Sequence, residues 1–163
     1  MMTEPGKRMS IGLDSAFDLF QKVGRDLTAV EREVTPDAVF NFVVTAHSLG
    51  DWVQKDPTVS PTAKQAAADL ARTNEWLLAC RDLANGNKHF GIGRYEPLVQ
   101  HADAATGFGM GRYGSGAYGV GEWSIKVSWG GATHSALDLV RRVHEAWAAF
   151  FRDCVPQGSA TAA

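Results

Sequence analysis

Hydrophobic residues recur at helical spacing through the first part of the chain. They lie three, four or seven positions apart, at Leu13, Phe17, Phe20, Leu27, Val30 and Val34. This spacing places them on one face and predicts an amphipathic helix over residues 14–34. Gly24 interrupts this segment at a cost of about 1 kcal/mol relative to alanine, so we expect it to mark close packing of helices.

A second helix is predicted to begin at Thr35-Pro36-Asp37. Threonine can cap the free N–H groups, proline loses no bond at the first helical position, and aspartate favours the positive end of the helix dipole. The segment that follows is hydrophobic on nearly all sides as far as Val53. We therefore expect this helix at the centre of a bundle.

The same start signal recurs at Ser60-Pro61 and predicts a third helix, in which alanine and other helix formers dominate. Asn85-Gly86 can end this helix with a left-handed cap. A continuation through His89 stays open, because glycine is tolerated inside a helix at some cost.

Glycine and aromatic residues then replace the helical pattern. Nine of the 17 glycines lie between positions 107 and 131. Residues 123–129 alternate strictly between large hydrophobic and polar side chains, which predicts a half-buried strand. Gly130-Gly131 offers the positive φ angles of a tight turn. We expect the pairing partner to come from residues 98–104 or from the glycine-rich stretch itself.

A last helix is predicted to begin near Ser135, with Asp138 at capping-box spacing. Its buried stripe consists of Ala136, Val140, Val143, Trp147, Phe150 and Cys154.

The sequence thus predicts a mainly α fold, a four-helix bundle with a glycine-rich β-hairpin inserted between the third and fourth helices. We expect one helical domain over residues 1–163, with the hairpin insert at about 95–134. The tails 1–10 and 156–163 are expected to be frayed.

Composition narrows the class of protein. The chain is 45% hydrophobic and 21% charged, which is ordinary globular usage. A net charge of -2 argues against a dedicated nucleic-acid binder. We see no signal peptide and no stretch of about 18 hydrophobic residues, so we expect no membrane partner. Cys80 and Cys154 lie in hydrophobic helical patterns, which suggests free thiols and a cytoplasmic location.

The segment from Arg81 to His89 is the strongest candidate site. If the third helix continues, Arg81, Asn85 and His89 follow one another at intervals of four and share a face. An arginine that holds a phosphate and a histidine that moves a proton are sufficient for RNA cleavage without metal. In this hypothesis Arg81 and His89 are catalytic, and Asn85 or Lys88 assists.

A structural interpretation of the same segment is also open. Arg81 would pair with an acidic neighbour, Asn85 and Asn87 would make the turn, and His89 would cap helix carbonyl groups.

The plan of helices and this motif resemble the HEPN superfamily. From His47 to His89 the sequence contains the pattern H-x-x-x-D-W … C-R-D-x-x-N-x-x-K-H, which is similar to uncharacterised bacterial proteins. HEPN proteins carry an arginine, commonly followed by a polar residue, with a histidine four to six positions beyond. Here Asp82 is that polar neighbour, and seven residues separate Arg81 from His89. The resemblance covers residues 14–90 and the last helix, but not the glycine-rich hairpin.

The resemblance has implications for function and assembly. Many HEPN proteins are toxins or defence ribonucleases that assemble their active site across a dimer, and members with altered motifs can be inactive scaffolds. It therefore implies a homodimer with an RNA or protein partner, in a toxin–antitoxin or phage-defence setting.

His47 and Asp51 form a second candidate, a polar pair one turn apart on the second helix. A buried imidazole that donates to a carboxylate is typical of a catalytic or metal-bound histidine. The alternative is a satisfied pair that specifies how the bundle packs. We expect no metal and no other cofactor, because the chain has neither H-E-x-x-H nor zinc-type Cys/His spacing. Only His47 and His144, with Asp51, stay possible as ligands.

The glycine-rich stretch contains two literal G-x-G-x-x-G matches, from Gly109 and from Gly114. Neither follows a credible strand or opens a helix, so we expect no phosphate site there. Arg112, Tyr113 and Tyr118 are candidate binding residues, which could form a platform on which bases stack. The alternative is that these aromatic side chains cover the open end of the bundle.

Two function classes follow from the sequence. One is a HEPN-like binding or regulatory module with no chemistry of its own, and the other is a metal-independent ribonuclease. Net acidity and the long spacing of the motif favour the first. The ribonuclease requires Arg81 and His89 to be accessible to solvent and to face one cleft.

Overall fold

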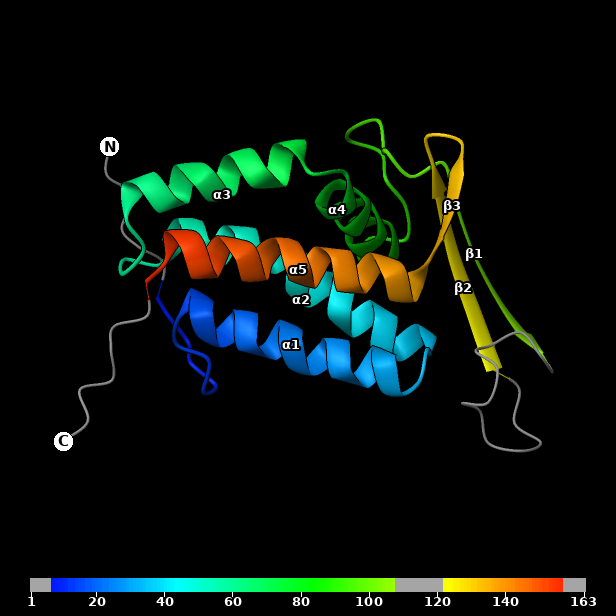
Figure 1. The fold of residues 1–163 in the computed structure, drawn as a ribbon, viewed down its shortest axis with the longest axis horizontal. Helices are drawn as coiled ribbons and strands as arrows, with labels where there is room; N and C mark the ends of the chain where they lie inside the picture. Colours follow the sequence, from blue (N-terminus) through cyan, green and yellow to red (C-terminus); the bar gives the residue numbers. More distant parts are fainter. Residues whose placement is uncertain (1–6, 108–121, 157–163) are drawn as a thin grey trace.

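A computed structural model describes residues 7–107 and 122–156 of the chain. These residues form five helices and a three-stranded antiparallel sheet (Figure 1). The helices are α1 (Ala16–Arg32), α2 (Pro36–Lys55), α3 (Pro61–Thr73), α4 (Glu75–Lys88) and α5 (Ala136–Cys154). The strands are β1 (His101–Gly107), β2 (Glu122–Trp129) and β3 (Ala132–Ser135). The predicted four-helix bundle with a hairpin between the third and fourth helices is therefore wrong.

Three predicted helix starts are confirmed by their capping residues, and α1 begins with a capping box of Ser15 and Asp18 that was not predicted. The Thr35 hydroxyl accepts a bond from the third residue of α2. Ser60 and Ser135 do the same for α3 and α5. Each cap satisfies N–H groups that have no partner inside the helix.

The error in the helix count arises at Asn74. The expected third helix is broken there, because Asn74 ends α3 and begins α4. Its backbone N–H donates to Leu70, and its side-chain oxygen accepts from the N–H groups of Trp76 and Leu77. One asparagine in an extended conformation thus caps both helices, and α4 leaves α3 in a new direction (Figure 1).

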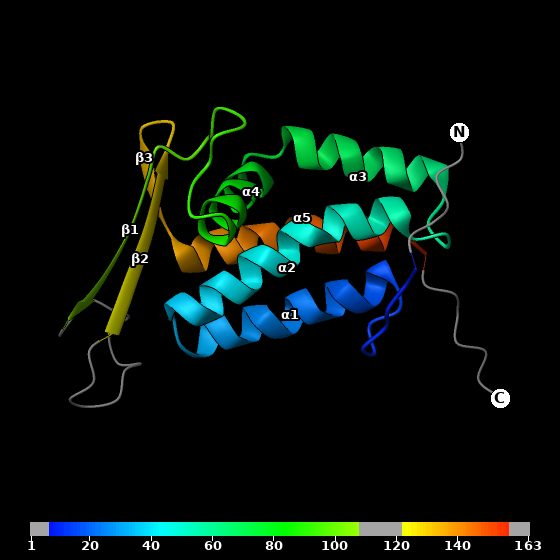
Figure 2. The same ribbon diagram turned by 180° about the vertical axis from the view of Figure 1, so that it is seen from behind.

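Helix α2 is central, as predicted, and contacts the other four helices. Helices α1 and α5 run beside it, and α3 lies along α5 (Figures 1 and 2). The interior between them consists mainly of aliphatic and aromatic side chains. Its largest fully buried members include Phe42, Leu49, Val53, Leu139, Val140 and Val143.

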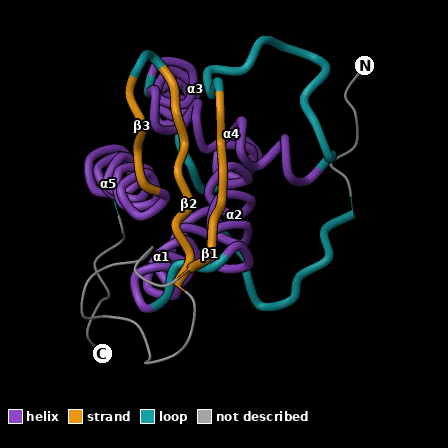
Figure 3. Tube along the Cα trace, turned by 90° about the vertical axis from the view of Figure 1, so that its right-hand side faces the viewer, coloured by secondary structure: helices purple, strands orange, loops and turns teal. Residues whose placement is uncertain are grey.

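The sheet stands across one end of the helices, in the order β1-β2-β3 (Figure 3). The predicted strand at residues 123–129 is confirmed as β2. Its partner β1 begins within the expected segment and pairs from His101↔Ser128 to Gly107↔Glu122. Gly130 and Gly131 have φ angles of 57° and 78°, so the predicted turn is confirmed. The third strand was not predicted.

Val127 and Trp129 carry the contact between the sheet and the helices, because both are buried. Trp129 packs edge-on against Trp76 of α4 and donates from Nε1 to Glu75 at 3.1 Å. The sheet therefore covers the beginning of α4 with one side of β2.

Several predictions fall outside the described residues. These are the glycine-rich candidates Arg112, Tyr113 and Tyr118, and most of the tails at 1–6 and 157–163. None of the helices in the described part of the chain has the length and hydrophobicity to cross a bilayer.

Candidate functional site

The buried carboxylate of Asp82 joins α4 to the loop that follows it. Arg81 donates to Asp82 Oδ1 from Nε at 3.1 Å and from Nη2 at 2.9 Å. The second oxygen, Oδ2, accepts from the backbone N–H of Val99 at 2.9 Å. The Asp82 side chain is 1% exposed and that of Arg81 is 31% exposed. The expected pairing of Arg81 with an acidic neighbour is confirmed.

Tyr95 closes a second set of contacts with the same motif. The Arg81 guanidinium lies over the Tyr95 ring, with Cζ 4.2 Å from the ring centre. Asn85 Nδ2 donates to the Tyr95 hydroxyl at 3.1 Å. Arg81, Asp82 and Asn85 thus hold the loop of residues 89–100 against α4. This arrangement gives the R-D-x-x-N part of the motif a structural role.

The end of α4 carries the other part of the motif. The helix continues past Gly86 to Lys88, so Asn85-Gly86 does not end it. His89 is the C-cap, and its backbone N–H donates to the Asn85 carbonyl at 3.0 Å. Phe90 follows with a φ of 60° and a fully exposed side chain. Lys88 and His89 are also exposed.

The two proposed catalytic residues do not come together in the pocket that the described residues form. His89 lies eight positions after Arg81, which is about 12 Å along a helix axis. Arg81 lines the pocket described below, and His89 does not. His89 is open to solvent, whereas Arg81 is half-buried and bound to Asp82.

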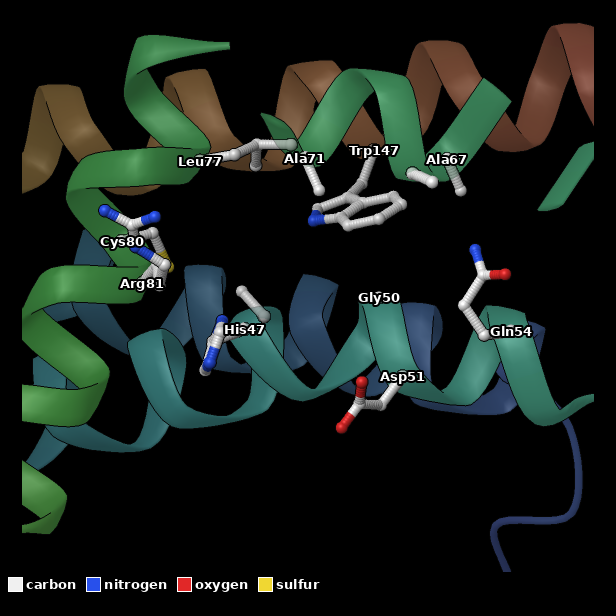
Figure 4. Close-up of a pocket in the computed structure, with 12 residues that line it drawn as sticks. His47, Gly50, Asp51, Gln54, Ala67, Ala71, Leu77, Cys80, Arg81 and Trp147 are labelled. Carbon is white, nitrogen blue, oxygen red and sulfur yellow. The ribbon is translucent and has the colours of Figure 1, made fainter. Parts of the chain in front are cut away.

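A pocket of about 230 Å³ lies between α2, α3 and α4, with α5 behind it (Figure 4). Its walls are mostly small or hydrophobic, and its polar groups come from α2, α4 and α5. The lining residues are Ala46, His47, Gly50, Asp51, Gln54, Ala67, Ala68, Ala71, Leu77, Cys80, Arg81 and Trp147.

Trp147 forms the floor of this pocket. Its side chain lies between α2 and α3, and the indole nitrogen points toward the α4 side (Figure 4). The residue is 2% exposed, and Nε1 has no hydrogen-bond partner among the residues that the structure describes. Buried polar groups are hydrogen-bonded in the great majority of cases, so this N–H is an exception that requires an explanation.

His47 and Asp51 lie at the outer rim of the pocket on α2 (Figure 4). Both residues are exposed, and neither side chain makes a hydrogen bond within the described part of the chain. The expected buried, bonded pair is therefore wrong. Loss of hydration lowers the pKa of His47, the Asp51 carboxylate opposes this, and the Arg81 charge adds to it. The lowered pKa favours a neutral imidazole near pH 7.

Gln54 closes the end of the pocket away from α4. Its Nε2 donates to the Lys64 carbonyl of α3 at 2.7 Å. This bond joins α2 to α3 at that end of the pocket.

The Cys80 thiol beside the pocket is buried and protonated. Burial raises the pKa of the Cys80 thiol to about 12, and its Sγ lies 3.6 Å from the Val43 carbonyl. A thiol of this kind is not a nucleophile at neutral pH. Cys80 and Cys154 are both free. Within residues 7–107 and 122–156, no three His, Cys, Asp or Glu side chains come close enough to hold a metal ion.

Sequence reasoning missed the two features that define these sites. Tyr95 and Val99 have no local pattern that ties them to α4. Trp147 was assigned correctly to the core stripe of α5, but the stripe does not show whether its N–H finds a partner. Tryptophan in a hydrophobic stripe is itself a signal, because its indole N–H requires a partner when it is buried.

Comparisons with protein-family models, with characterised proteins and with solved structures found no match to this chain.

Proposed function

We propose that this chain is a HEPN-like binding module with no chemistry of its own, and that its ligand is a small molecule held in the pocket between α2, α3 and α4. One observation carries the proposal, which is the unpartnered indole N–H of Trp147 at the floor of that pocket. A buried donor without a partner costs about 1–3 kcal/mol. A ligand with a hydrogen-bond acceptor would recover this free energy on binding.

The ribonuclease alternative has less support. Catalysis would require the Arg81 guanidinium to bind a phosphate, but two of its donors are bound to Asp82 and its face lies against Tyr95. His89 is too far along α4 to act on the same phosphate within one protomer. The direct test incubates total RNA with the wild type and with Arg81→Ala. Cleavage that is lost in the variant would favour the enzyme over the binding module.

Gly50 provides the test of the binding site. It lines the pocket, and a Cβ atom at this position would have no neighbour within 4 Å. Gly50→Ala should stabilise the helix by about 0.5–1 kcal/mol and leave most of the pocket open. Gly50→Leu should keep the fold and fill the space beside Trp147.

The experiment is a screen of small metabolites by thermal shift against the wild type, Gly50→Ala and Gly50→Leu. We expect ligands that stabilise the first two proteins and not Gly50→Leu. Ligands that stabilise all three equally would bind elsewhere and would contradict the proposed site. Ligand binding is detected as a rise in the melting temperature of the protein, because a ligand that binds the native state stabilises it.

The HEPN-like resemblance adds a homodimer to this proposal. Sedimentation equilibrium should then give about twice the 17.6 kDa mass of one chain. A single species at the mass of one chain, over a wide range of concentrations, would remove the dimer and leave the pocket unaffected.

A further inference from the structure

Resting on the proposed function, we propose that the ligand of this pocket is a flat bicyclic heteroaromatic amine. Its ring carries a hydrogen-bond acceptor that meets the N–H of Trp147, and its amino group is a cation that lies near Asp51 at the rim.

The volume of the pocket indicates how many fused rings the ligand has. An apolar cavity of about 150 Å³ is large enough to bind benzene. The pocket here has about 230 Å³. The added volume fits a second fused ring, whereas a nucleotide with its sugar and phosphate is too large to be enclosed.

The walls favour a flat ligand. On the α2 side the pocket is bounded by Ala46 and Gly50, and on the α3 side by Ala67 and Ala71. These residues have small or no side chains, and the ring of Trp147 lies between the two helices beside them (Figure 4). A ligand therefore meets a flat aromatic ring bordered by small side chains, a surface that a flat aromatic ring covers with little loss of conformational entropy.

The floor of the pocket requires an acceptor. Trp147 Nε1 can only donate, because the lone pair of an indole nitrogen belongs to the ring. It is buried and unpartnered among the described residues, and it lies on the side of the Trp147 ring that faces α4, in a residue that lines the pocket. A ring nitrogen or a carbonyl group on the ligand satisfies it, whereas a hydrocarbon ring leaves it unpaired.

The charges around the pocket select a cation. Arg81 is the positive group of the lining, and Asp82 neutralises it through two hydrogen bonds. Asp51 is the acidic group of the lining, and no cation of the described residues pairs with it. The Asp51 carboxylate is therefore a charge of the lining without an ion-pair partner among the described residues, and it attracts an ammonium group and repels a carboxylate.

Four probe compounds separate the contribution of the ring acceptor to the affinity from that of the ammonium group. The first is a quinoline with an aminomethyl group on its carbocyclic ring, and the second is the naphthalene with the same aminomethyl group. The third is quinoline itself, and the fourth is the quinoline with a carboxylate in place of the aminomethyl group. Binding is followed by the indole ¹H–¹⁵N signals of the full chain, and the Trp147 signal is assigned by its loss in Trp147→Phe.

We expect the aminomethyl quinoline to bind most tightly and to move the Trp147 indole signal. Loss of the ring nitrogen should weaken binding about three- to tenfold, which is the value of one hydrogen bond. Asp51→Asn should weaken the aminomethyl quinoline about two- to fivefold and leave quinoline unchanged. Asp37→Asn, an exposed carboxylate at the other end of α2, is the matched control and should change neither affinity.

The outcomes distinguish the ligand class from the proposed function. If the naphthalene amine binds as tightly as the quinoline amine, or the carboxylate as tightly as the amine, the pocket binds ligands but the class is wrong. If none of the four compounds moves the Trp147 signal, the pocket admits no such ring and the ligand class is overturned, whereas the small-molecule function is overturned only if the metabolite screen also finds no ligand that distinguishes Gly50→Leu from the wild type. Gly50→Leu should abolish every shift, and persistence of the shifts in that variant would also overturn the site.

Discussion

The guanidinium of Arg81 lies 4.2 Å above the ring of Tyr95, a residue fourteen positions further along the chain. The same guanidinium binds the buried carboxylate of Asp82, and Asn85 holds the Tyr95 hydroxyl. A motif that resembles a catalytic signature thus ties the loop of residues 89–100 to α4.

Tyr95 tests this tie directly. Tyr95→Phe removes the hydrogen bond from Asn85 and should lower the free energy of unfolding by about 1 kcal/mol. Tyr95→Ala also removes the contact with Arg81 and should cost about 2 kcal/mol. Urea unfolding measures both. Hydrogen exchange at the amide of Val99 should become faster in Tyr95→Ala, and an unchanged rate would show that the loop is held by other contacts.

Asp82 should be more costly to change than a surface carboxylate. Asp82→Asn removes the charge that binds Arg81 and leaves one fewer acceptor for the Val99 amide, so we expect a loss of about 1–3 kcal/mol. Asp69→Asn is the matched control, because Asp69 pairs with Arg72 on the surface of α3. An exposed pair of this kind contributes less than about 1 kcal/mol. Equal losses in the two variants would contradict the structural role of Asp82.

Trp147 also has a stability role. It packs edge-on against Phe150 at 5.6 Å and is 2% exposed. Trp147→Ala should lower the free energy of unfolding by about 3–5 kcal/mol because it leaves a cavity in the core. Trp147→Phe keeps an aromatic ring and should cost less. A thermal melt of Trp147→Ala within a degree or two of the wild type would contradict the placement of this side chain.

Asp56 should make stability depend on pH in the acid range. Burial raises the pKa of its carboxyl group, but bonds from Thr58 and from the Ala16 amide outweigh this and leave the pKa lowered. A group whose pKa is lower in the folded state stabilises the fold above its unfolded pKa. This stabilisation is lost as the pH falls through the folded pKa.

The measurement compares the wild type with Asp56→Asn by urea unfolding between about pH 2 and pH 6. The wild type should be more stable at the upper end, and the difference should shrink toward the lower end. A difference that stays constant across the range would show that the Asp56 charge does not stabilise the contact between α1 and the α2–α3 connection.

Much of the fold follows from local signals. The hydroxyl caps and the prolines at the first helical positions locate the starts of α2 and α3, and strict alternation locates β2. The break at Asn74 was missed, because hydrophobic periodicity and helix formers continue across it. Asn74 followed by Glu75 is typical of a helix start. In the sequence this signal is masked, because the helical pattern of hydrophobic residues continues on both sides of it.

The candidate sites were likewise predicted only in part. The residues of the motif could be named from the sequence, and so could His47 and Asp51. The contacts of the motif with Tyr95 and Val99 could not be named, and neither could the walls of the pocket around His47 and Asp51, because these residues come together only after the loop and α3 have folded back.

The order of residues along the chain by itself determined where most helices begin, which faces of them are hydrophobic, and where a strand and its glycine turn lie, because caps and periodicity act over a few residues. Only the tertiary structure decided that the Arg81 guanidinium lies over Tyr95 rather than facing a cleft with His89, and that the indole N–H of Trp147 has no partner among the described residues around it. Those relationships depend on segments far apart in the chain, whose relative positions are set by the packing of the whole core.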